Sequence, residues 1–328
     1  MAGNCTFTNN FICDFVAATN INSISGYEGW QCTSDKKPLT DPCIDHTSWF
    51  DLICRYDGCI SVLSLSSVNI KGTLPENLYK ISTLSNIELS YNLLSGTIPL
   101  LYTELPELTN LWLSGNLISG QLPSGMEKLT RLQAVNMDHN LLTGIIPSVF
   151  GQMSYLSYVI LHNNRFNGTV PKEIFSPILW DLLLGYNELT GYIASEIGLA
   201  SSLAFVNLES NQIMGTLPTS LGQLGSLSSF HVQNNRDING QIPQELCDLS
   251  ILSINVAGTG IDCYGGCLTS AAISVVGASS DCHSDYELHV FLSVLGGVVV
   301  GTAAAAVWYS RISRQQYSIP MYDTPTVV

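Results

Sequence analysis

Very few side chains in this sequence have the type and spacing needed for covalent or metal chemistry. His139 and His162 are the pair best placed to meet, but no third ligand lies near them, so we expect two surface histidines and no metal site. No GxSxG, HExxH, GxGxxG or GxxxxGK run occurs, and the acidic residues form no evident catalytic pair. The sequence therefore predicts a protein that is not an enzyme and uses no cofactor.

The ten cysteines gather at the two ends of the 328-residue chain. Six precede residue 60 (Cys5, Cys13, Cys32, Cys43, Cys54, Cys59) and four follow residue 246 (Cys247, Cys263, Cys267, Cys282). No CxxC or HxxxH spacing of the kind that binds zinc is present. Two even-numbered groups that flank a cysteine-free middle are typical of disulfide-stapled ends in an oxidising compartment, although the spacing does not determine the pairing.

The charge balance excludes one class of partner. The formal net charge is −14, with only 12 lysines and arginines. Nucleic-acid binding depends on clustered basic residues that neutralise phosphates, so we expect no nucleic-acid partner.

The cysteine-free middle consists of repeats. The runs NLLSGTIP (92–99), NLISGQLP (116–123) and NLLTGIIP (140–147) are three of eight copies of one pattern. The first apolar residue of each unit falls at Ile60, Leu84, Leu108, Leu132, Leu156, Leu179, Leu203, Leu227 and Ile251, a spacing of 24 residues with a single gap of 23. Nine units at near-constant spacing indicate a solenoid, since one unit cannot bury its own leucines but stacked units can.

Each unit supplies elements with definite roles. Leu111-Trp112-Leu113 exemplifies the short strand, whose leucines point into the core. The asparagine that follows each strand, such as Asn116, is expected to satisfy backbone groups at the turn, so that stacked copies form a ladder. These asparagines are given a structural role and no binding role.

The repeats resemble the plant-type leucine-rich repeats of receptor-like proteins, receptor kinases and polygalacturonase-inhibiting proteins. The resemblance is strong over 60–261 and weaker in WFDLICRYDGCISVLSL (49–65), which looks like the family's amino-terminal cap, with a cap helix expected at 11–18. It implies an α/β fold, a curved, right-handed parallel-sheet horseshoe. The expected parts are a Cys-rich cap (1–59), the repeats (60–261), a second cap and linker (262–287), a transmembrane helix (288–310) and a short cytoplasmic tail (311–328).

Candidate ligand contacts lie on the concave face, which comprises the strand residues that alternate with the core leucines. Equivalent positions of neighbouring units form columns there, because parallel strands lie about 4.8 Å apart. Large apolar side chains cluster in the third to seventh units, with polar neighbours. We define these residues as the aromatic patch: Trp112, Tyr158, Ile160, His162, Asp181, Leu183, Tyr186 and Phe205. Aromatic anchors among polar groups are typical of interface hot spots, so the patch is the predicted ligand site.

Residues 290–309 contain no charge and are long enough to span a bilayer as a helix. Arg311 and Arg314 follow directly, which favours a cytoplasmic tail and extracellular repeats. Sequons at Asn4 and Asn167 agree with this topology. No signal peptide is visible at the start, so a tail-anchored protein with cytosolic repeats is the alternative.

The sequence thus favours a single-pass receptor-like protein at the cell surface that binds a peptide, glycan or protein ligand. The tail is too short for a kinase domain, so signalling would need a co-receptor, through the membrane helix or the tail. Two other functions stay open: an adhesion or structural coat protein, and a membrane-tethered inhibitor of a secreted hydrolase, as the related inhibitor proteins imply.

Overall fold

The structure, a computed structural model, describes residues 11–35, 37, 38, 40, 42, 43, 51–247, 249, 251, 253–263 and 274–276. The chain divides into two units, 1–282 and 283–328, and every described residue belongs to the first. The predicted membrane helix, the tail, the sequon at Asn4 and most of the second cap lie outside the described residues. Within the described ranges, no helix is long and apolar enough to cross a bilayer.

The main sheet has eleven strands, ten of which come one after another from successive turns of the chain. Its strands, in spatial order, are β1 (Leu52–Cys54), β2 (Ile60–Ser64), β4 (Asn86–Glu88), β6 (Asn110–Trp112), β8 (Ala134–Asn136), β10 (Tyr158–Ile160), β12 (Asp181–Leu183), β14 (Phe205–Asn207), β16 (Ser229–His231), β18 (Ser253–Asn255) and β20 (Ser274–Val276). Only β1, which pairs with β2, is antiparallel to its neighbour in this sheet.

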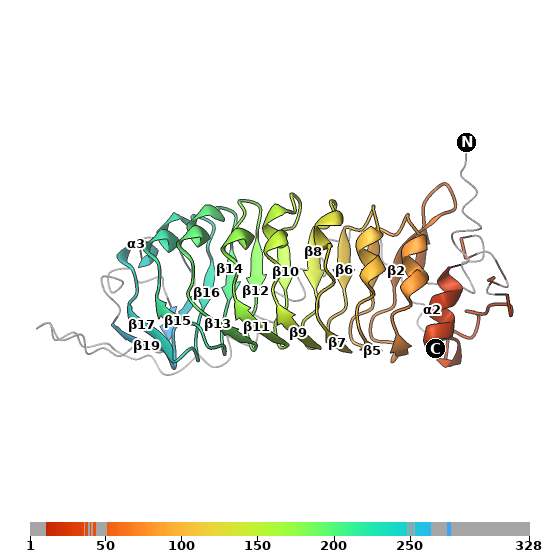
Figure 1. Cartoon of the computed structure of the whole chain (residues 1–328), viewed down its shortest axis with the longest axis horizontal. Helices are drawn as coiled ribbons and strands as arrows, with labels where there is room; N and C mark the ends of the chain where they lie inside the picture. The colour runs from red at the N-terminus through yellow and green to blue at the C-terminus, as the bar shows by residue number, and fades with distance from the viewer. Residues whose placement is uncertain are drawn as a thin grey trace, which may run out of the picture. The chain divides into compact units, whose positions relative to one another are not determined.

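Each unit also contributes a second short strand and, in most units, a short helix. The second strands form two smaller parallel sheets: β3 (Lys71–Thr73), β5 (Leu93–Gly96), β7 (Leu117–Gly120), β9 (Leu141–Ile145), β11 (Arg165–Thr169) and β13 (Glu188–Thr190), then β15 (Met214–Thr216), β17 (Asp237–Gln241) and β19 (Gly260–Cys263). The helices are the 3-10 turns η2 (Glu76–Lys80), η3 (Leu100–Glu104), η4 (Met126–Lys128), η5 (Ser148–Gln152), η6 (Lys172–Ile174), η7 (Ser195–Leu199) and η8 (Thr219–Gln223), followed by α3 (Gln244–Cys247). Figure 1 shows successive coils side by side, with these helices aligned along one side.

The strand register places equivalent residues of neighbouring units beside one another. In β10, for example, Val159 pairs with Val135 of β8 and Leu182 of β12. These central residues are fully buried in the leucine core, which therefore runs through the stacked units without a break. The unit that is one residue short keeps this register, because the missing residue falls near the short helix η6 and not in a strand.

The asparagine ladder predicted from the repeat is confirmed. Asn116 donates from Nδ2 to the carbonyl oxygens of Leu89 (3.0 Å) and Leu113 (3.0 Å), and its Oδ1 accepts from the Leu94 N–H (3.0 Å). The same bonds recur from Asn92 to Asn235. Each asparagine thus joins its own turn to the preceding unit and pairs backbone groups that burial would otherwise leave unsatisfied.

The expected cap helix is also confirmed, as α2 (Ile12–Ala18), followed by the short turn η1 (Ile21–Ser23). Disulfides Cys13–Cys32 and Cys43–Cys54 staple this end, and Cys59 is disulfide-bonded as well. Gly72 makes the helix–sheet contact possible. A Cβ there would lie 2.0 Å from the Ala18 carbonyl oxygen, and its φ of +124° disfavours any other residue.

Candidate functional site

The structure brings most of the aromatic patch together in two rows across adjacent strands. The first row pairs Tyr158 with Asp181 and Asp181 with Phe205. The second row pairs Ile160 with Leu183. Within each of these strands the central residue is buried in the core, so the residues on either side of it point to the concave face.

Trp112 lies at the edge of this group. It occupies the row of Ile160, but Asn136 of β8 stands between them. The four large apolar residues of the two rows and Trp112 are half-buried, as expected of side chains that pack against neighbours in their rows.

Asp181 differs from its expected environment. The sequence places it among solvent-facing residues, yet its side chain is 0% exposed. Neither carboxylate oxygen has a hydrogen-bond partner among the described residues. Burial raises the pKa of Asp181 to about 7, because an ionised carboxylate loses its hydration there. The pKa of the Tyr158 hydroxyl is also raised, chiefly by burial and further by the charge of Asp181.

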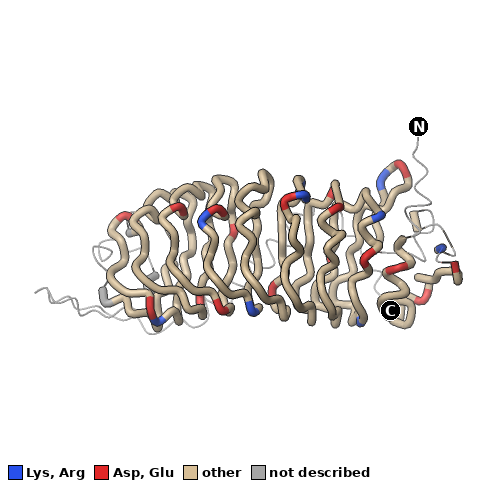
Figure 2. Tube along the Cα trace, viewed as in Figure 1, with Lys and Arg blue, Asp and Glu red and all other residues tan. Residues whose placement is uncertain are grey.

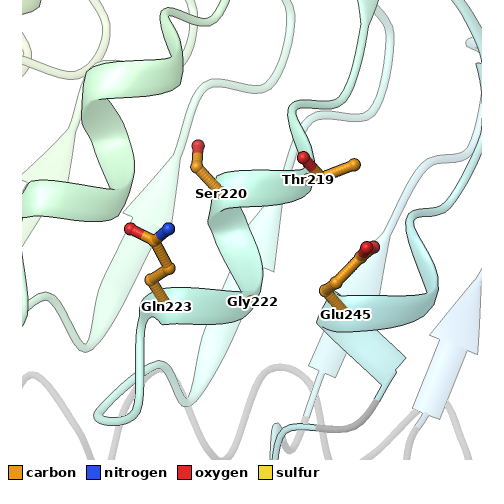
Figure 3. Close-up of a pocket in the computed structure, with 5 residues that line it drawn as sticks. All are labelled: Thr219, Ser220, Gly222, Gln223 and Glu245. Carbon is orange, nitrogen blue, oxygen red and sulfur yellow. The ribbon is translucent and has the colours of Figure 1, made fainter.

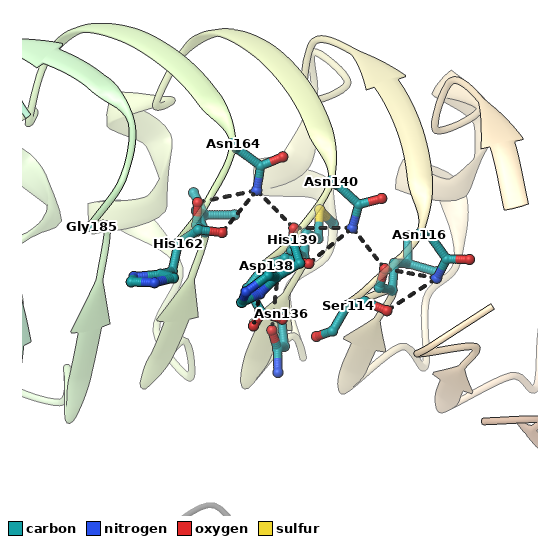
Figure 4. Close-up of polar contacts among 12 residues, drawn as sticks. Ser114, Asn116, Asn136, Asp138, His139, Asn140, His162, Asn164 and Gly185 are labelled. Carbon is teal, nitrogen blue, oxygen red and sulfur yellow. Dashed lines mark hydrogen bonds and ion pairs between the residues drawn. The ribbon is translucent and has the colours of Figure 1, made fainter. Parts of the chain in front are cut away.

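His162 and Tyr186 belong to a second cluster, at the ends of the same strands. The rings of His139 and His162 have centroids 5.8 Å apart, and those of His162 and Tyr186 are 5.0 Å apart in an edge-to-face contact. His139 bonds through Nδ1 to Asp138 (2.9 Å) (Figure 4). Burial lowers the pKa of His162, so its ring is neutral at pH 7.

The expected approach of the two histidines is thus confirmed. Within the described ranges, no group of three histidine, cysteine or acidic side chains is arranged to hold a metal ion.

Charge is distributed unevenly over the coils. The strands of the eleven-stranded sheet contain no lysine or arginine, whereas Glu88 and Asp181 lie in them and Asp138 and Glu209 lie just beyond. Most of the described basic residues lie on or next to the short helices and the second strands, whereas Lys37 lies in the cap and Arg55 directly follows β1; Figure 2 shows basic residues in blue. From β4 to β18 the described strands of this sheet therefore carry acidic residues and no lysine or arginine.

Two features near the predicted site were not foreseen. Trp180, directly before β12, is 43% exposed. A signal was present in the sequence, since no other unit has an aromatic residue at the equivalent position, where most units have a small one such as Ser85, Thr109 or Ser157. Asn167 lies on an exposed position of β11, so its sequon is accessible in the fold.

A shallow depression lies away from this face, between η8 and α3. Thr219, Ser220, Gly222, Gln223 and Glu245 line it (Figure 3). It forms because the two short helices pack tightly: a Cβ on Gly222 would lie 2.3 Å from the Cβ of Glu245. The depression is open and contains one acidic group, which gives no chemistry beyond that of an ordinary surface.

Comparison with known proteins agrees with this architecture. The Leucine Rich Repeat family model matches residues 107–129 and 131–153. No curated protein sequence matches the chain. Among solved structures, the plant peptide hormone receptor RGFR1 in complex with RGF2 is 26% identical with a TM-score of 0.64, covering 66% of this chain and 35% of that one.

Two further structures come from Arabidopsis. The leucine-rich-repeat ectodomain of the membrane receptor kinase GASSHO1/SCHENGEN3, in complex with CASPARIAN STRIP INTEGRITY FACTOR 2, is 24% identical with a TM-score of 0.59, covering 76% of this chain and 36% of that one. The receptor kinase HAESA, in complex with the peptide hormone IDA and the co-receptor SERK1, is 23% identical with a TM-score of 0.55, covering 84% and 53%.

This chain thus spans between 35% and 53% of the length of these three structures. The repeat pattern, the parallel sheets, the asparagine ladder and the structural matches agree. The chain contains leucine-rich repeats, and their solenoid is similar in fold to the ectodomains of plant membrane receptors.

Proposed function

We propose that this chain is a receptor-like protein that binds a peptide or protein ligand on its concave face by non-covalent recognition. The observation that carries the proposal is the aromatic patch, where Tyr158, Phe205 and their neighbours gather around a buried acid. Half-buried aromatic side chains beside a desolvated polar group are the usual anchors of a protein interface.

The structural relatives support a peptide ligand. RGFR1 is a plant peptide hormone receptor solved in complex with RGF2, and HAESA was solved with the peptide hormone IDA and the co-receptor SERK1. By analogy, this chain would recruit a signalling partner after it binds its ligand. We further propose that residues 288–310 anchor it to the plasma membrane and that the repeats lie outside the cell, since the disulfides of the cap suit an oxidising compartment.

A peptide-selection experiment tests this proposal. The full chain is immobilised and challenged with a displayed library of random peptides, in parallel with a variant that carries Trp112→Ala, Tyr158→Ala and Phe205→Ala. The control variant carries Leu93→Ala, Leu117→Ala and Leu141→Ala, which removes leucines that are 41%, 48% and 37% exposed on the six-stranded sheet.

Peptides should be enriched on the natural chain and on the control variant but not on the aromatic variant. The aromatic variant should keep its melting temperature to within a few degrees, because none of the three side chains lies in the leucine core. Equal enrichment on all three proteins, or on none, would overturn the proposal. A large fall in melting temperature would show that the aromatic side chains hold the fold together instead.

A further inference from the structure

The buried carboxyl group of Asp181 has no evident role in the fold. It is 0% exposed, and among the described residues neither of its oxygens accepts a hydrogen bond. Every other unit places an uncharged residue at this position, from Val62 to Ser253. A buried polar group without a partner destabilises a fold, so the solenoid alone gives no reason for an acid here.

Among the described residues, the surroundings of Asp181 provide no counter-ion. No strand of its sheet carries a lysine or arginine, and the charged side chains near the concave face are the acids Glu88, Asp138 and Glu209. The neighbouring histidine, His162, has a pKa lowered by burial and is neutral at pH 7. The described part of the chain thus offers Asp181 no positive charge, which leaves the carboxyl group open to a cation of a bound molecule.

The residues on either side of Asp181 favour an organic cation over a metal ion. Tyr158 and Phe205 are its register partners on β10 and β14, and strands of a sheet lie about 4.8 Å apart. Aromatic rings attract an ammonium or guanidinium group through the electrons of their faces. A hard metal ion would need several oxygen ligands, which Phe205 and Leu183 do not supply.

We propose that Asp181, Tyr158 and Phe205 form a subsite for one organic cation of the ligand, the guanidinium or ammonium group of a basic peptide residue. The proposal rests on the proposed function and adds the chemical class of one anchor residue. Because Asp181 is fully buried in the free protein, the side chains around it have to move aside when the cation binds. In the complex the cation pairs with the carboxylate and lies beside the two rings, which neutralises the buried charge.

The test compares two short peptides that differ in charge and scarcely in shape. Acetyl-Gly-Arg-Gly-amide carries a guanidinium group, and acetyl-Gly-citrulline-Gly-amide replaces it by an uncharged urea. Acetyl-Gly-Lys-Gly-amide carries an ammonium group, and its comparison with the arginine peptide shows which of the two cations the subsite prefers. Each peptide is titrated by ligand-observed NMR into the purified full chain, up to about 10 mM, since one anchor side chain supports only millimolar affinity.

On the natural chain the arginine or the lysine peptide should bind at least about tenfold more tightly than the citrulline peptide. Asp181→Asn should abolish this preference, and Tyr158→Leu should weaken it. The control substitution Asp237→Asn, at an exposed acid on β17, should leave it unchanged.

Equal binding of charged and uncharged peptides to the natural chain, or no binding of either, would overturn the subsite. The library selection described above then decides the proposed function separately. If random peptides are enriched on the natural chain but show no basic residue in common, the concave face binds peptides and the cation subsite is wrong. If none are enriched, both proposals fail.

Discussion

Replacing Asp181 by asparagine removes a group whose ionisation opposes folding. Burial raises the pKa of Asp181 from its ordinary value of 3.8 to about 7, so the folded protein holds this proton more tightly than the unfolded chain does. The fold therefore favours the protonated carboxyl group over its ionised form. Stability contributed by this proton is fully present below about pH 4 and is lost as the pH rises to about 7.

The magnitude follows from the size of the change in pKa. A difference of about 3 pKa units corresponds to about 4 kcal/mol when the group is fully ionised in both states. The substituted asparagine keeps the size of the side chain but does not titrate. Any cost of burying an amide is the same at every pH, so only the pH-dependent part of the comparison reports on the carboxyl group.

Urea denaturation followed by tryptophan fluorescence measures this difference on the purified full chain. Between about pH 4.5 and about pH 8, the natural chain should lose about 3 kcal/mol relative to the Asp181→Asn variant, since part of the full difference lies below pH 4.5. The exposed Asp237→Asn variant should stay parallel to the natural chain. A difference between the natural chain and the Asp181→Asn variant that does not change with pH would refute the argument that this carboxyl group is buried without a partner.

Three other substitutions test the contacts of the fold and the side of the membrane on which the repeats lie. Gly72→Ala should lower the free energy of unfolding by at least about 2 kcal/mol more than Gly26→Ala does. Both glycines have a positive φ, but only Gly72 contacts the end of the cap helix. Equal losses would mean that this contact is unimportant. Asn140→Ala should lower the free energy of unfolding by about 2–3 kcal/mol, since it leaves a buried N–H of the preceding unit unpaired. Asn136→Ala, outside the ladder, should lower it by less than about 1 kcal/mol. Similar losses would contradict a structural ladder. In cells, glycosidase treatment should increase the gel mobility of the natural chain more than that of the Asn167→Gln variant; an unmodified Asn167 would argue against extracellular repeats.

The sequence predicts the repeating parts of this fold well because each unit depends mainly on its immediate neighbours. The positions of the strands follow from the leucine spacing, and the role of Asn116 follows from its place at the turn. The cap helix at 11–18 was also visible, as a short apolar run beside Cys13. The second strands, such as β9, were not predicted, since they contain a single inward-pointing apolar residue and a glycine.

The environment of individual side chains on the concave face was harder to predict. The sequence shows that Tyr158, Asp181 and Phe205 fall in one column, and the structure confirms their register. The sequence does not show that Asp181 is fully buried, because burial depends on how the surrounding side chains pack, which the residue types in a column do not give. The exposed Trp180 was missed for a related reason: it precedes the strand and belongs to neither of the columns used to predict the patch.

The regular strand spacing also sets a length scale for the ligand. Trp112 lies on β6 and Phe205 on β14, and the register places four strand-to-strand steps between them. At about 4.8 Å per step the patch extends over about 19 Å, which an extended peptide covers with about six residues. A shorter peptide cannot contact both ends at once. The number of repeat units between β6 and β14 thus sets the minimum length of a peptide that contacts both ends of the patch. Adding or removing one unit would change that length by one or two residues.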